Sequence, residues 1–205
     1  MNQVLDLIFQ ILILIFSVVI HEVSHGAVAY AMGDSTAKNE GRLTLNPINH
    51  LDPFGSIILP LLTYLGGGFI FGWAKPVPYN PYNLKIKNMF GLSPEALVGA
   101  AGPLSNIAIA LVFGFAVRFS GELALPSQFA QISASIAALN LILAFFNLVP
   151  IPPLDGSKIL FAMLPSGESA MRLRAFFEQY GIILLLIFIF FFSGVILPIA
   201  FFFFR

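Results

Sequence analysis

Long apolar runs alternate with short polar stretches along the whole chain, and this pattern predicts helices that cross a membrane. A helix needs roughly 20 apolar residues to span a bilayer. Apolar runs of about this length cover residues 4–32, 54–71, 94–118, 130–148 and 176–204. The sequence therefore predicts an all-α polytopic membrane protein with four to five transmembrane helices.

The second run is the ambiguous one, because Pro60 and the triplet Gly66, Gly67 and Gly68 weaken it as a helix. Positive residues favour the cytoplasmic side of a membrane, which provides a test. If all five runs cross, the 10 cationic residues divide six against four. If the second run dips in and returns, they divide eight against two, with only Arg118 and Arg205 on the minor side. The charges thus favour four crossings plus one re-entrant segment, with the N-terminus outside.

Two polar stretches between the apolar runs predict a short β element near the membrane. The alternation in GRLTL, residues 41–45, predicts a strand that ends at Asn46 and Pro47. Residues 73–88, WAKPVPYNPYNLKIKN, are rich in Pro and Asn and cannot form a long helix. Extended backbone at membrane depth is tolerated only against protein or water. Both stretches are therefore expected beside the functional residues.

Composition agrees with the membrane prediction. The chain is 58% hydrophobic and 10% charged, with a mean hydropathy of +0.91, whereas soluble domains are about a quarter charged. A formal net charge of zero argues against a nucleic-acid partner, which would require a basic face. The absence of cysteine excludes disulfides, thiolate metal sites and cysteine nucleophiles. No repeat or linker divides the chain, so residues 1–205 are interpreted as one domain.

Three polar side chains interrupt the first apolar run, in the sequence HEVSH. His21 and His25 are four residues apart and share one helix face, where two neutral imidazoles can bind one zinc ion. Glu22 is adjacent and can take a proton from a zinc-bound water. A buried histidine is more often a hydrogen-bonded core residue, but ionisable groups inside a membrane helix normally have a function or a partner. The motif therefore predicts a catalytic zinc site.

A catalytic zinc site needs a third protein ligand and an open position for water. Without cysteine, the candidates outside the first helix are His50 and the carboxylates of Asp34, Glu40, Asp52, Glu95, Glu122, Asp155, Glu168 and Glu178. Asp155 is favoured, because the prolines at 150, 152 and 153 break an apolar helix and present this carboxylate from a rigid bend. The alternative is that Asp155 merely caps a helix starting near Ser157, and both roles could hold at once.

Other polar residues have open roles. His50 is interpreted as an ordinary loop histidine, as a group that orients Glu22 or binds water, or as a zinc ligand. Asn147 could donate a hydrogen bond to the oxyanion of a tetrahedral intermediate, or satisfy backbone groups freed by the prolines. Asn106 is favoured as a helix–helix contact, and Gly102, like its neighbour Gly99, suits close approach of a helix to the catalytic core.

With HExxH in the first apolar helix and N-L-V-P-x-P-P-L-D-G at residues 147–156, the chain resembles the site-2 protease family of intramembrane zinc metalloproteases. AGPLSN, residues 101–106, matches a motif of the family's middle core helix. LNPINHLDPFGSIILPLL and GWAKPVPYNP resemble the small prokaryotic branch, without a PDZ or CBS domain. Ser157 stands where many relatives have a second glycine. Together these stretches cover most of the chain, and the paired motifs are specific.

The resemblance implies that His21, His25 and Asp155 ligate one zinc ion, with Glu22 as catalytic base and acid. It implies that Asn147 holds the substrate or the oxyanion. An extended element around residues 72–80 would pair with an unwound substrate strand, and its candidate contacts are Trp73, Val77, Pro78 and Tyr79.

The implied substrates are transmembrane proteins or peptides that reach the site from the lipid bilayer. The resemblance also implies a multi-pass protein of a prokaryotic cell membrane, with its active site towards the cytoplasmic side. The rival interpretation is a non-proteolytic zinc-binding or metal-transporting membrane protein, since His and Glu inside helices also mark ion pathways. An inactive scaffold is disfavoured by the intact Glu22. The substrate, the oligomeric state and the gating motion stay open.

Overall fold

The computed structural model describes residues 3–58, 62, 74–85, 93–165 and 167–203. Its four long helices are α1 (Gln3–Ala31), α4 (Pro94–Arg118), α5 (Ser127–Asn147) and α7 (Glu168–Phe203). Each contains a segment long and apolar enough to cross a membrane, namely Ile8–Ala31, Pro94–Arg118, Ser127–Asn147 and Glu168–Phe191. These four helices confirm the all-α polytopic architecture.

Shorter helices connect and flank the long ones. The structure places them at α2 (Thr36–Asn39), η1 (Pro47–His50), η2 (Pro53–Ile58), η3 (Pro81–Asn83) and α6 (Asp155–Met163). Prolines at the first position of η1 and η3 begin those turns, where no N–H is needed. The proline-rich residues after α5 separate it from α6, so the break expected from the sequence lies directly before Asp155.

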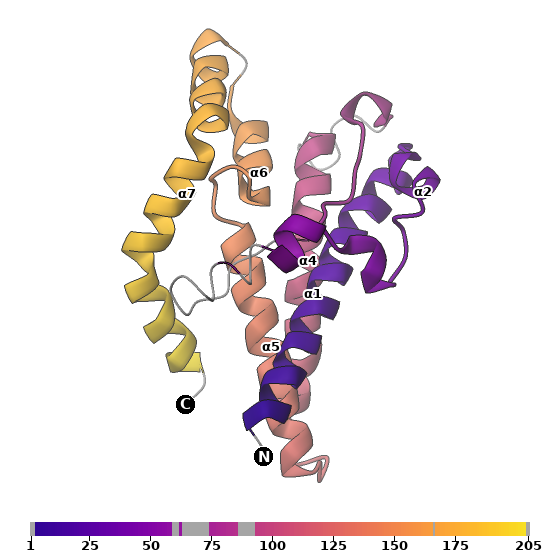
Figure 1. The fold of residues 1–205 in the computed structure, drawn as a ribbon, viewed down its shortest axis with the longest axis vertical. Coiled ribbons are helices and arrows are strands. Elements are labelled where there is room, and N and C mark those ends of the chain that lie inside the picture. The colour runs from indigo at the N-terminus through magenta and orange to yellow at the C-terminus, as the bar shows by residue number, and fades with distance from the viewer. Residues whose placement is uncertain (1–2, 59–61, 63–73, 86–92, 166, 204–205) are drawn as a thin grey trace.

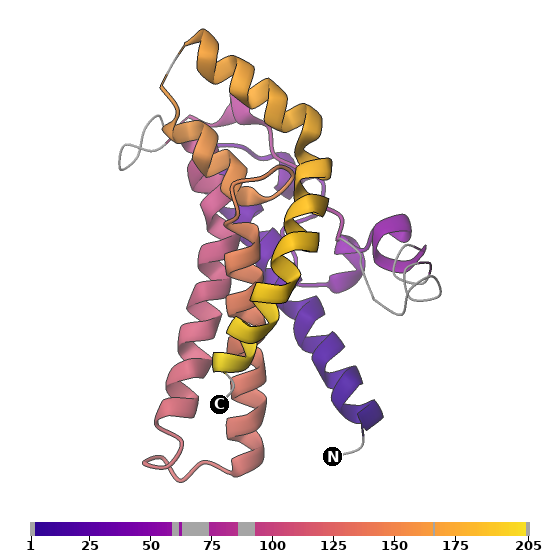
Figure 2. The same cartoon turned by 90° about the vertical axis from the view of Figure 1, so that its left-hand side faces the viewer.

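The two termini lie at the same end of the molecule, as Figures 1 and 2 both show. The chain rises along α1, descends along α4, rises again through α5 and α6, and descends along α7. The loop between α4 and α5 therefore lies at the same end of the molecule as the termini, and α2 and η3 lie at the opposite end. Segments at that other end contain several cationic residues: Lys38 in α2, Lys85 after η3, and Arg172 and Arg174 in the first turns of α7.

Helix α4 packs against α1, α5 and α6 and has eight buried residues. Small residues allow this close contact. A Cβ atom added to Gly102 would lie 2.5 Å from the Nε2 atoms of both His21 and His25, and one added to Gly99 would lie 3.0 Å from Cβ of Lys158. The expected role of these glycines in close helix approach is confirmed, and it brings α4 directly beneath the two histidines.

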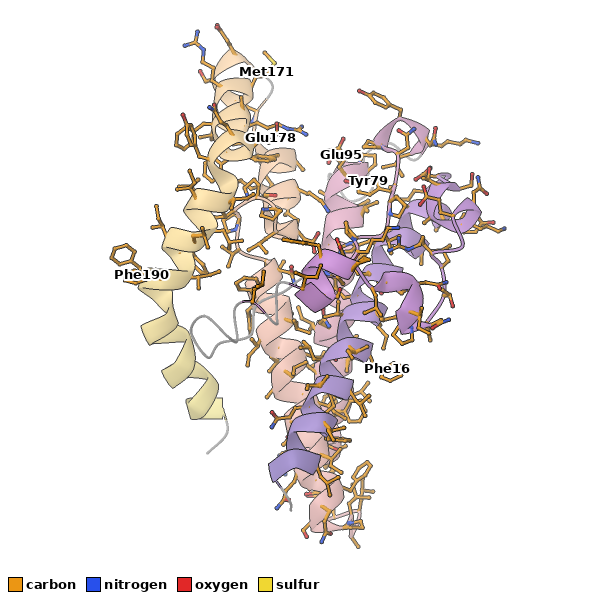
Figure 3. All side chains as sticks on the ribbon, in the orientation of Figure 1. Phe16, Tyr79, Glu95, Met171, Glu178 and Phe190 are labelled. Carbon is orange, nitrogen blue, oxygen red and sulfur yellow. The ribbon has the colours of Figure 1, made fainter. Side chains whose placement is uncertain are left out.

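Helix α7 is largely exposed over its described side chains. Only 11% of the apolar stretch within Glu168–Phe191 is buried. The helix does approach the chain closely at Gly181, where an added Cβ atom would lie 2.6 Å from the Pro152 carbonyl oxygen. Phe190 of α7 and Phe16 of α1 both point away from the bundle in Figure 3, and they are 80% and 49% exposed. Exposed aromatic side chains on apolar helices are typical of a surface solvated by lipid.

The expected β element is not formed in the described part of the chain, which contains no strand. Residues 41–45 form a turn and bends, with Gly41 at φ +64°. Pro76 and Pro78 have no N–H to contribute to a ladder, and the guanidinium of Arg42 donates instead to the carbonyl oxygens of Lys75 (2.8 Å) and Pro76 (3.3 Å). Side-chain contacts therefore replace strand pairing here.

The second apolar run begins with η2, a short π-type helix. Most of residues 54–71 lies outside the described residues, so the re-entrant segment stays a prediction. Trp73 also lies outside them.

Candidate active site

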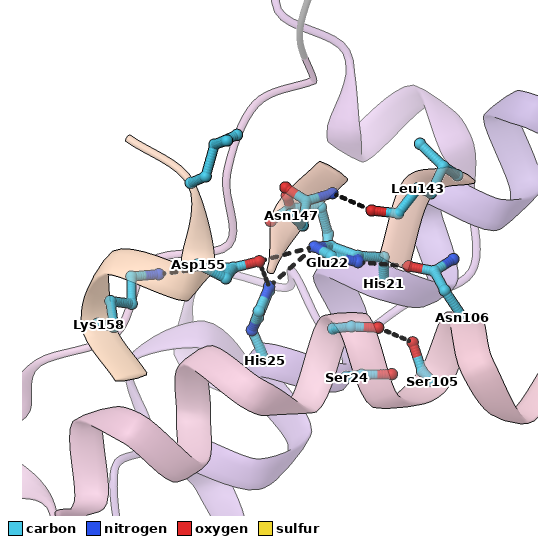
Figure 4. A network of polar contacts seen from close by, with 12 residues as sticks. His21, Glu22, Ser24, His25, Ser105, Asn106, Leu143, Asn147, Asp155 and Lys158 are labelled. Carbon is cyan, nitrogen blue, oxygen red and sulfur yellow. Dashed lines mark hydrogen bonds and ion pairs between the residues drawn. The ribbon is translucent and has the colours of Figure 1, made fainter. Parts of the chain in front are cut away.

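Three side chains distant in sequence converge at one point (Figure 4). His21 and His25 come from successive turns of α1, and Asp155 is the first residue of α6. Oδ2 of Asp155 lies 3.0 Å from Nε2 of His21 and 3.1 Å from Nε2 of His25, and the two Nε2 atoms are 3.1 Å apart. Each residue is only 6% exposed. Within the described residues, this is the one group of three or more such side chains placed to hold a metal.

The geometry of the three atoms fits a zinc ion. Ligands about 2.0–2.2 Å from a tetrahedral zinc lie roughly 3.3 Å from one another. The observed separations of 3.0 to 3.1 Å are within a few tenths of an ångström of that value. Two imidazoles and one carboxylate are also a donor set that catalytic zinc sites use.

The outer hydrogen bonds of the histidines set their tautomers. Nδ1 of His25 lies 2.6 Å from the carbonyl oxygen of Val98, which can only accept, so Nδ1 carries the proton. Nδ1 of His21 lies 2.6 Å from Oδ1 of Asn106 and donates to it in the same way. In their neutral, metal-binding forms both histidines therefore turn the Nε2 lone pair towards the Asp155 carboxylate. Three buried lone pairs at this distance repel one another unless a cation lies between them.

The two oxygens of Asp155 have different partners. Oδ2 faces the histidines, while Oδ1 accepts a hydrogen bond from Nζ of Lys158 at 3.0 Å. Helix α6 begins at Asp155 with Leu154 as its N-cap, and no side chain caps it. The capping alternative is therefore wrong, because Asp155 is the first residue inside the helix and its carboxylate bonds the histidines and Lys158. The sequence prediction missed Lys158, although its i+3 spacing from Asp155 was a usable signal.

Glu22 lies beside the cluster in Figure 4. Its Oε2 accepts a hydrogen bond from the backbone N–H of Val77 at 2.9 Å. The Val77 side chain is only 6% exposed and lies against α1, where a Cβ atom on Gly26 would meet it at 2.7 Å. The residues expected to contact substrate therefore include one, Val77, whose side chain is packed inward and whose amide holds Glu22.

The segment 74–77 that carries this amide is held from several sides. Besides the Arg42 contacts, the N–H of Lys75 donates to the carbonyl oxygen of His50 at 2.9 Å. His50 itself is 1% exposed, and its Nε2 donates to the carbonyl oxygen of Thr44 at 2.8 Å. The structure does not bring His50 into the cluster with His21, and this histidine holds the loop.

Asp34 anchors the next part of the same loop, a role that the sequence did not reveal. It is 0% exposed. Its carboxylate accepts hydrogen bonds from the N–H of Asn80 at 2.8 Å, from Nδ2 of Asn83 at 2.9 Å and from Oγ1 of Thr36 at 2.6 Å. An aspartate soon after the end of a helix is typical of a turn. Its distant hydrogen-bond partners could therefore not be inferred from the sequence.

The remaining predicted residues lie around the cluster. Nδ2 of Asn147 donates to the carbonyl oxygen of Leu143 at 3.0 Å, within its own helix. Pro78 and Tyr79 are partly buried, and Lys158 Nζ lies 5.6 Å from the centre of the Tyr79 ring. The other carboxylates considered as ligands do not join the metal-binding group.

Four apolar helices around a buried His–His–Asp cluster define a multi-pass membrane protein with a candidate metal centre. A family model described as Peptidase family M50 matches residues 120–191, which include Asn147 and Asp155. The chain is 40% identical over 185 residues to the Bacillus subtilis protein named "Putative zinc metalloprotease YwhC", covering 87% of this chain and 78% of that relative. The chain belongs to peptidase family M50, and the resemblance to site-2 proteases is confirmed.

More distant relatives have similar names. The chain is 28% identical to "Putative zinc metalloprotease Rip2" of Mycolicibacterium smegmatis over 84% of its own length and 63% of that protein. It is 29% identical to the Rip2 of Mycobacterium tuberculosis H37Rv over 83% of its own length and 62% of that protein. The chain thus spans under two thirds of the length of these two relatives. No solved structure matches.

Proposed function

We propose that this protein is an intramembrane zinc metalloprotease that hydrolyses peptide bonds in or next to transmembrane segments of its substrates. Residues 1–205 form its single protease domain. His21, His25 and Asp155 hold one zinc ion, and Glu22 is the general base and acid. The observation that carries this proposal is the convergence of three buried lone-pair atoms at 3.0 to 3.1 Å beside a glutamate.

The bound zinc ion supplies Lewis acidity, which polarises a carbonyl group and lowers the pKa of water. The residues of the chain supply the rest. Glu22 takes a proton from the attacking water and returns it to the nitrogen of the leaving amine. The Val77 N–H occupies one oxygen of this carboxylate and fixes its direction. The packing of α4 against α1 and α6 keeps the ligands dry, since each ligand is 6% exposed.

The substrate is proposed to contact Trp73, Val77, Pro78 and Tyr79, with Asn147 contacting it from the end of α5. A peptide bond in a helix has its carbonyl hydrogen-bonded, so the substrate must be unwound before attack. Helix-breaking residues near the scissile bond would therefore increase cleavage.

The site is proposed to face the cytoplasmic side of a prokaryotic cell membrane. His25 is six residues from the end of α1, about 9 Å of helix rise. That end of the molecule includes Lys38 and Arg42, whereas Arg118 ends α4 at the opposite end. Positive residues concentrate on the cytoplasmic side, so the charge distribution supports this orientation.

Zinc content per chain in detergent-purified protein is the first test, with wild type beside Asp155→Ala and His50→Ala. We expect about one zinc in wild type, loss of zinc in Asp155→Ala and retention in His50→Ala. Zinc retained in Asp155→Ala and lost in His50→Ala would move the third ligand to the loop.

Cleavage of a transmembrane substrate in liposomes then separates a protease from a metal-binding or metal-transporting protein. Glu22→Gln should retain zinc while turnover falls by about 10²- to 10⁴-fold, because the general base is removed. Undiminished turnover in this variant would overturn the assignment of Glu22. Zinc-loaded wild type that cleaves no transmembrane segment would favour the rival function.

A further inference from the structure

Two buried asparagines form a continuous hydrogen-bonded chain across three helices, on the side of His21 opposite His25 and Asp155. Nδ2 of Asn106 on α4 donates to Oδ1 of Asn140 on α5 at 2.8 Å. Nδ2 of Asn140 donates to the carbonyl oxygen of Ile136 at 2.9 Å and to Oγ of Ser17 on α1 at 2.9 Å. Both asparagines are 0% exposed and Ser17 is 4% exposed. Figure 4 shows Asn106 at the far side of His21 from Asp155.

The direction of this chain is determined by backbone carbonyls, which can only accept. The Ile136 carbonyl requires the amide nitrogen of Asn140 to face it, so Oδ1 of Asn140 faces Asn106. Nδ2 of Asn106 must then face Asn140, a direction that its contact with the Ser17 carbonyl at 3.4 Å also favours. Oδ1 of Asn106 is left for His21, and the proton between them must come from Nδ1 of the imidazole.

The consequence reaches the metal site. A neutral imidazole has one N–H and one lone pair, so a proton on Nδ1 leaves the lone pair on Nε2. Reversing either amide would place two acceptors within 3 Å of each other in a buried site, which is costly. The orientation of Asn140, on a helix that contributes no histidine to the site, therefore determines which nitrogen of His21 is available to a metal ion.

We infer that Asn140 and Asn106 form a positioning relay from α5 through α4 that fixes the tautomer and ring orientation of His21 and so presents its Nε2 to the metal ion. The relay rests on the proposed function, since it acts on the proposed zinc ligand. It differs from the support of His25, which needs only the backbone carbonyl of Val98. The two ligands on α1 are thus oriented by different means, one by side chains and one by backbone.

The test measures zinc affinity by competition with a chelator in detergent-purified, full-length variants. Asn106→Leu removes the acceptor for His21 and should weaken zinc binding by about 10- to 100-fold. Asn106→Asp keeps the acceptor for His21, although its second oxygen would face Oδ1 of Asn140. It should bind zinc less tightly than wild type but more tightly than Asn106→Leu, a rescue that a role in packing alone would not produce. Asn140→Leu keeps Asn106 but removes the acceptor that fixes the orientation of its amide. Zinc affinity should then fall about fivefold.

Ser133→Ala is the matched control. Ser133 lies seven residues before Asn140 on α5 and is 0% exposed, and its Oγ has no hydrogen-bond partner in the described part of the chain. Removing this buried oxygen should leave zinc affinity unchanged. If Asn106→Leu does not fold, the comparison of Asn140→Leu with Ser133→Ala carries the test.

A spectroscopic measurement tests the tautomer itself. The chain has only three histidines, so ¹⁵N-histidine labelling of zinc-saturated protein gives few signals. Wild type should show slowly exchanging Nδ1 protons on His21 and His25. Asn106→Leu should lose protection at His21 alone, because the Val98 carbonyl still protects His25.

The outcomes separate the relay from the proposed function. Zinc bound by wild type, with affinity unchanged within about twofold in Asn106→Leu and Asn140→Leu, would overturn the relay alone. Retention of the protected His21 proton in Asn106→Leu would also overturn it. Absence of zinc from wild type would overturn the proposed function and the relay together.

Discussion

Behind His21 the site is lined by side chains of three long helices, whereas beside Glu22 it is bordered by a loop. Asn106, Asn140 and Ser17 are between 0 and 4% exposed and are joined by side-chain hydrogen bonds. Glu22 instead receives one backbone N–H from Val77, in a segment with no regular secondary structure. The metal ligands thus depend on helix packing, while the orientation of the proposed base depends on a loop outside the long helices.

We call the helix-lined part of the site, with Ser17, Gly102, Asn106 and Asn140, the packed side. This difference predicts that changes in the packed side will weaken metal binding, and that changes in the loop will lower turnover while zinc is retained. Four substitutions test the comparison, from the largest expected effect to the smallest.

Gly102→Ala should weaken zinc binding by about 100-fold or more, because its Cβ would lie 2.5 Å from both Nε2 atoms. The measurement is zinc affinity by chelator competition. Gly114→Ala on the same helix is the control, since its Cβ would meet nothing within 4 Å. Wild-type affinity in Gly102→Ala would show that the packed side is not rigid.

Val77→Pro removes the N–H that holds Glu22 and should lower kcat by about 10- to 100-fold, the value of one hydrogen bond to a charged group. Zinc content should stay at the wild-type value. Val77→Ala keeps the N–H and controls for the lost side-chain packing. Equal turnover in the two variants would contradict a role for this amide in orienting Glu22.

Asp34→Asn should lower the free energy of unfolding by about 1–3 kcal/mol, because a carboxylate that receives several hydrogen bonds is replaced by an amide. Burial raises the pKa of Asp34, but hydrogen bonds from Thr36, Asn83 and the Asn80 N–H outweigh it and keep the pKa below 3.8. A lowered folded-state pKa gives stability that is present above 3.8 and lost as the pH falls below it.

Thermal unfolding of wild type and Asp34→Asn from neutral to acidic pH measures this contribution. The difference between the two proteins should shrink as the pH falls. Zinc content at neutral pH should be the same in both, because Asp34 holds the loop and not the ligands. Loss of zinc in the folded variant would remove the distinction between the two sides.

Lys158→Met should weaken zinc binding only about two- to fivefold, because its contact with Oδ1 of Asp155 involves a side chain that is 32% exposed. Chelator competition at low and high salt measures it, since screening should reduce the effect. Lys158→Arg keeps the charge and should stay close to wild type. A loss as large as that expected for Gly102→Ala would place Lys158 in the packed side.

Local patterns predicted the three residues that converge in the His–His–Asp cluster. The i,i+4 spacing of His21 and His25 places them on one face of α1 in any packing, and the prolines before Asp155 end α5 and isolate its carboxylate. Structure brings these three together as expected, although only a metal measurement assigns their role. The strand expected at residues 41–45 was wrong, because alternation alone does not supply a hydrogen-bonding partner.

The sequence by itself determined the four apolar helices, the shared face of the two histidines and the break before Asp155, because these follow from hydropathy, helical period and proline geometry. Only the tertiary structure decided that Asn140 stands behind His21 and Asn106, and that the Val77 N–H holds Glu22. The Asn106–Asn140 and Glu22–Val77 hydrogen bonds join residues 34 and 55 positions apart, and such partners depend on how helices and loops pack. An amide in an apolar helix signals that a partner exists, but packing alone selects which one.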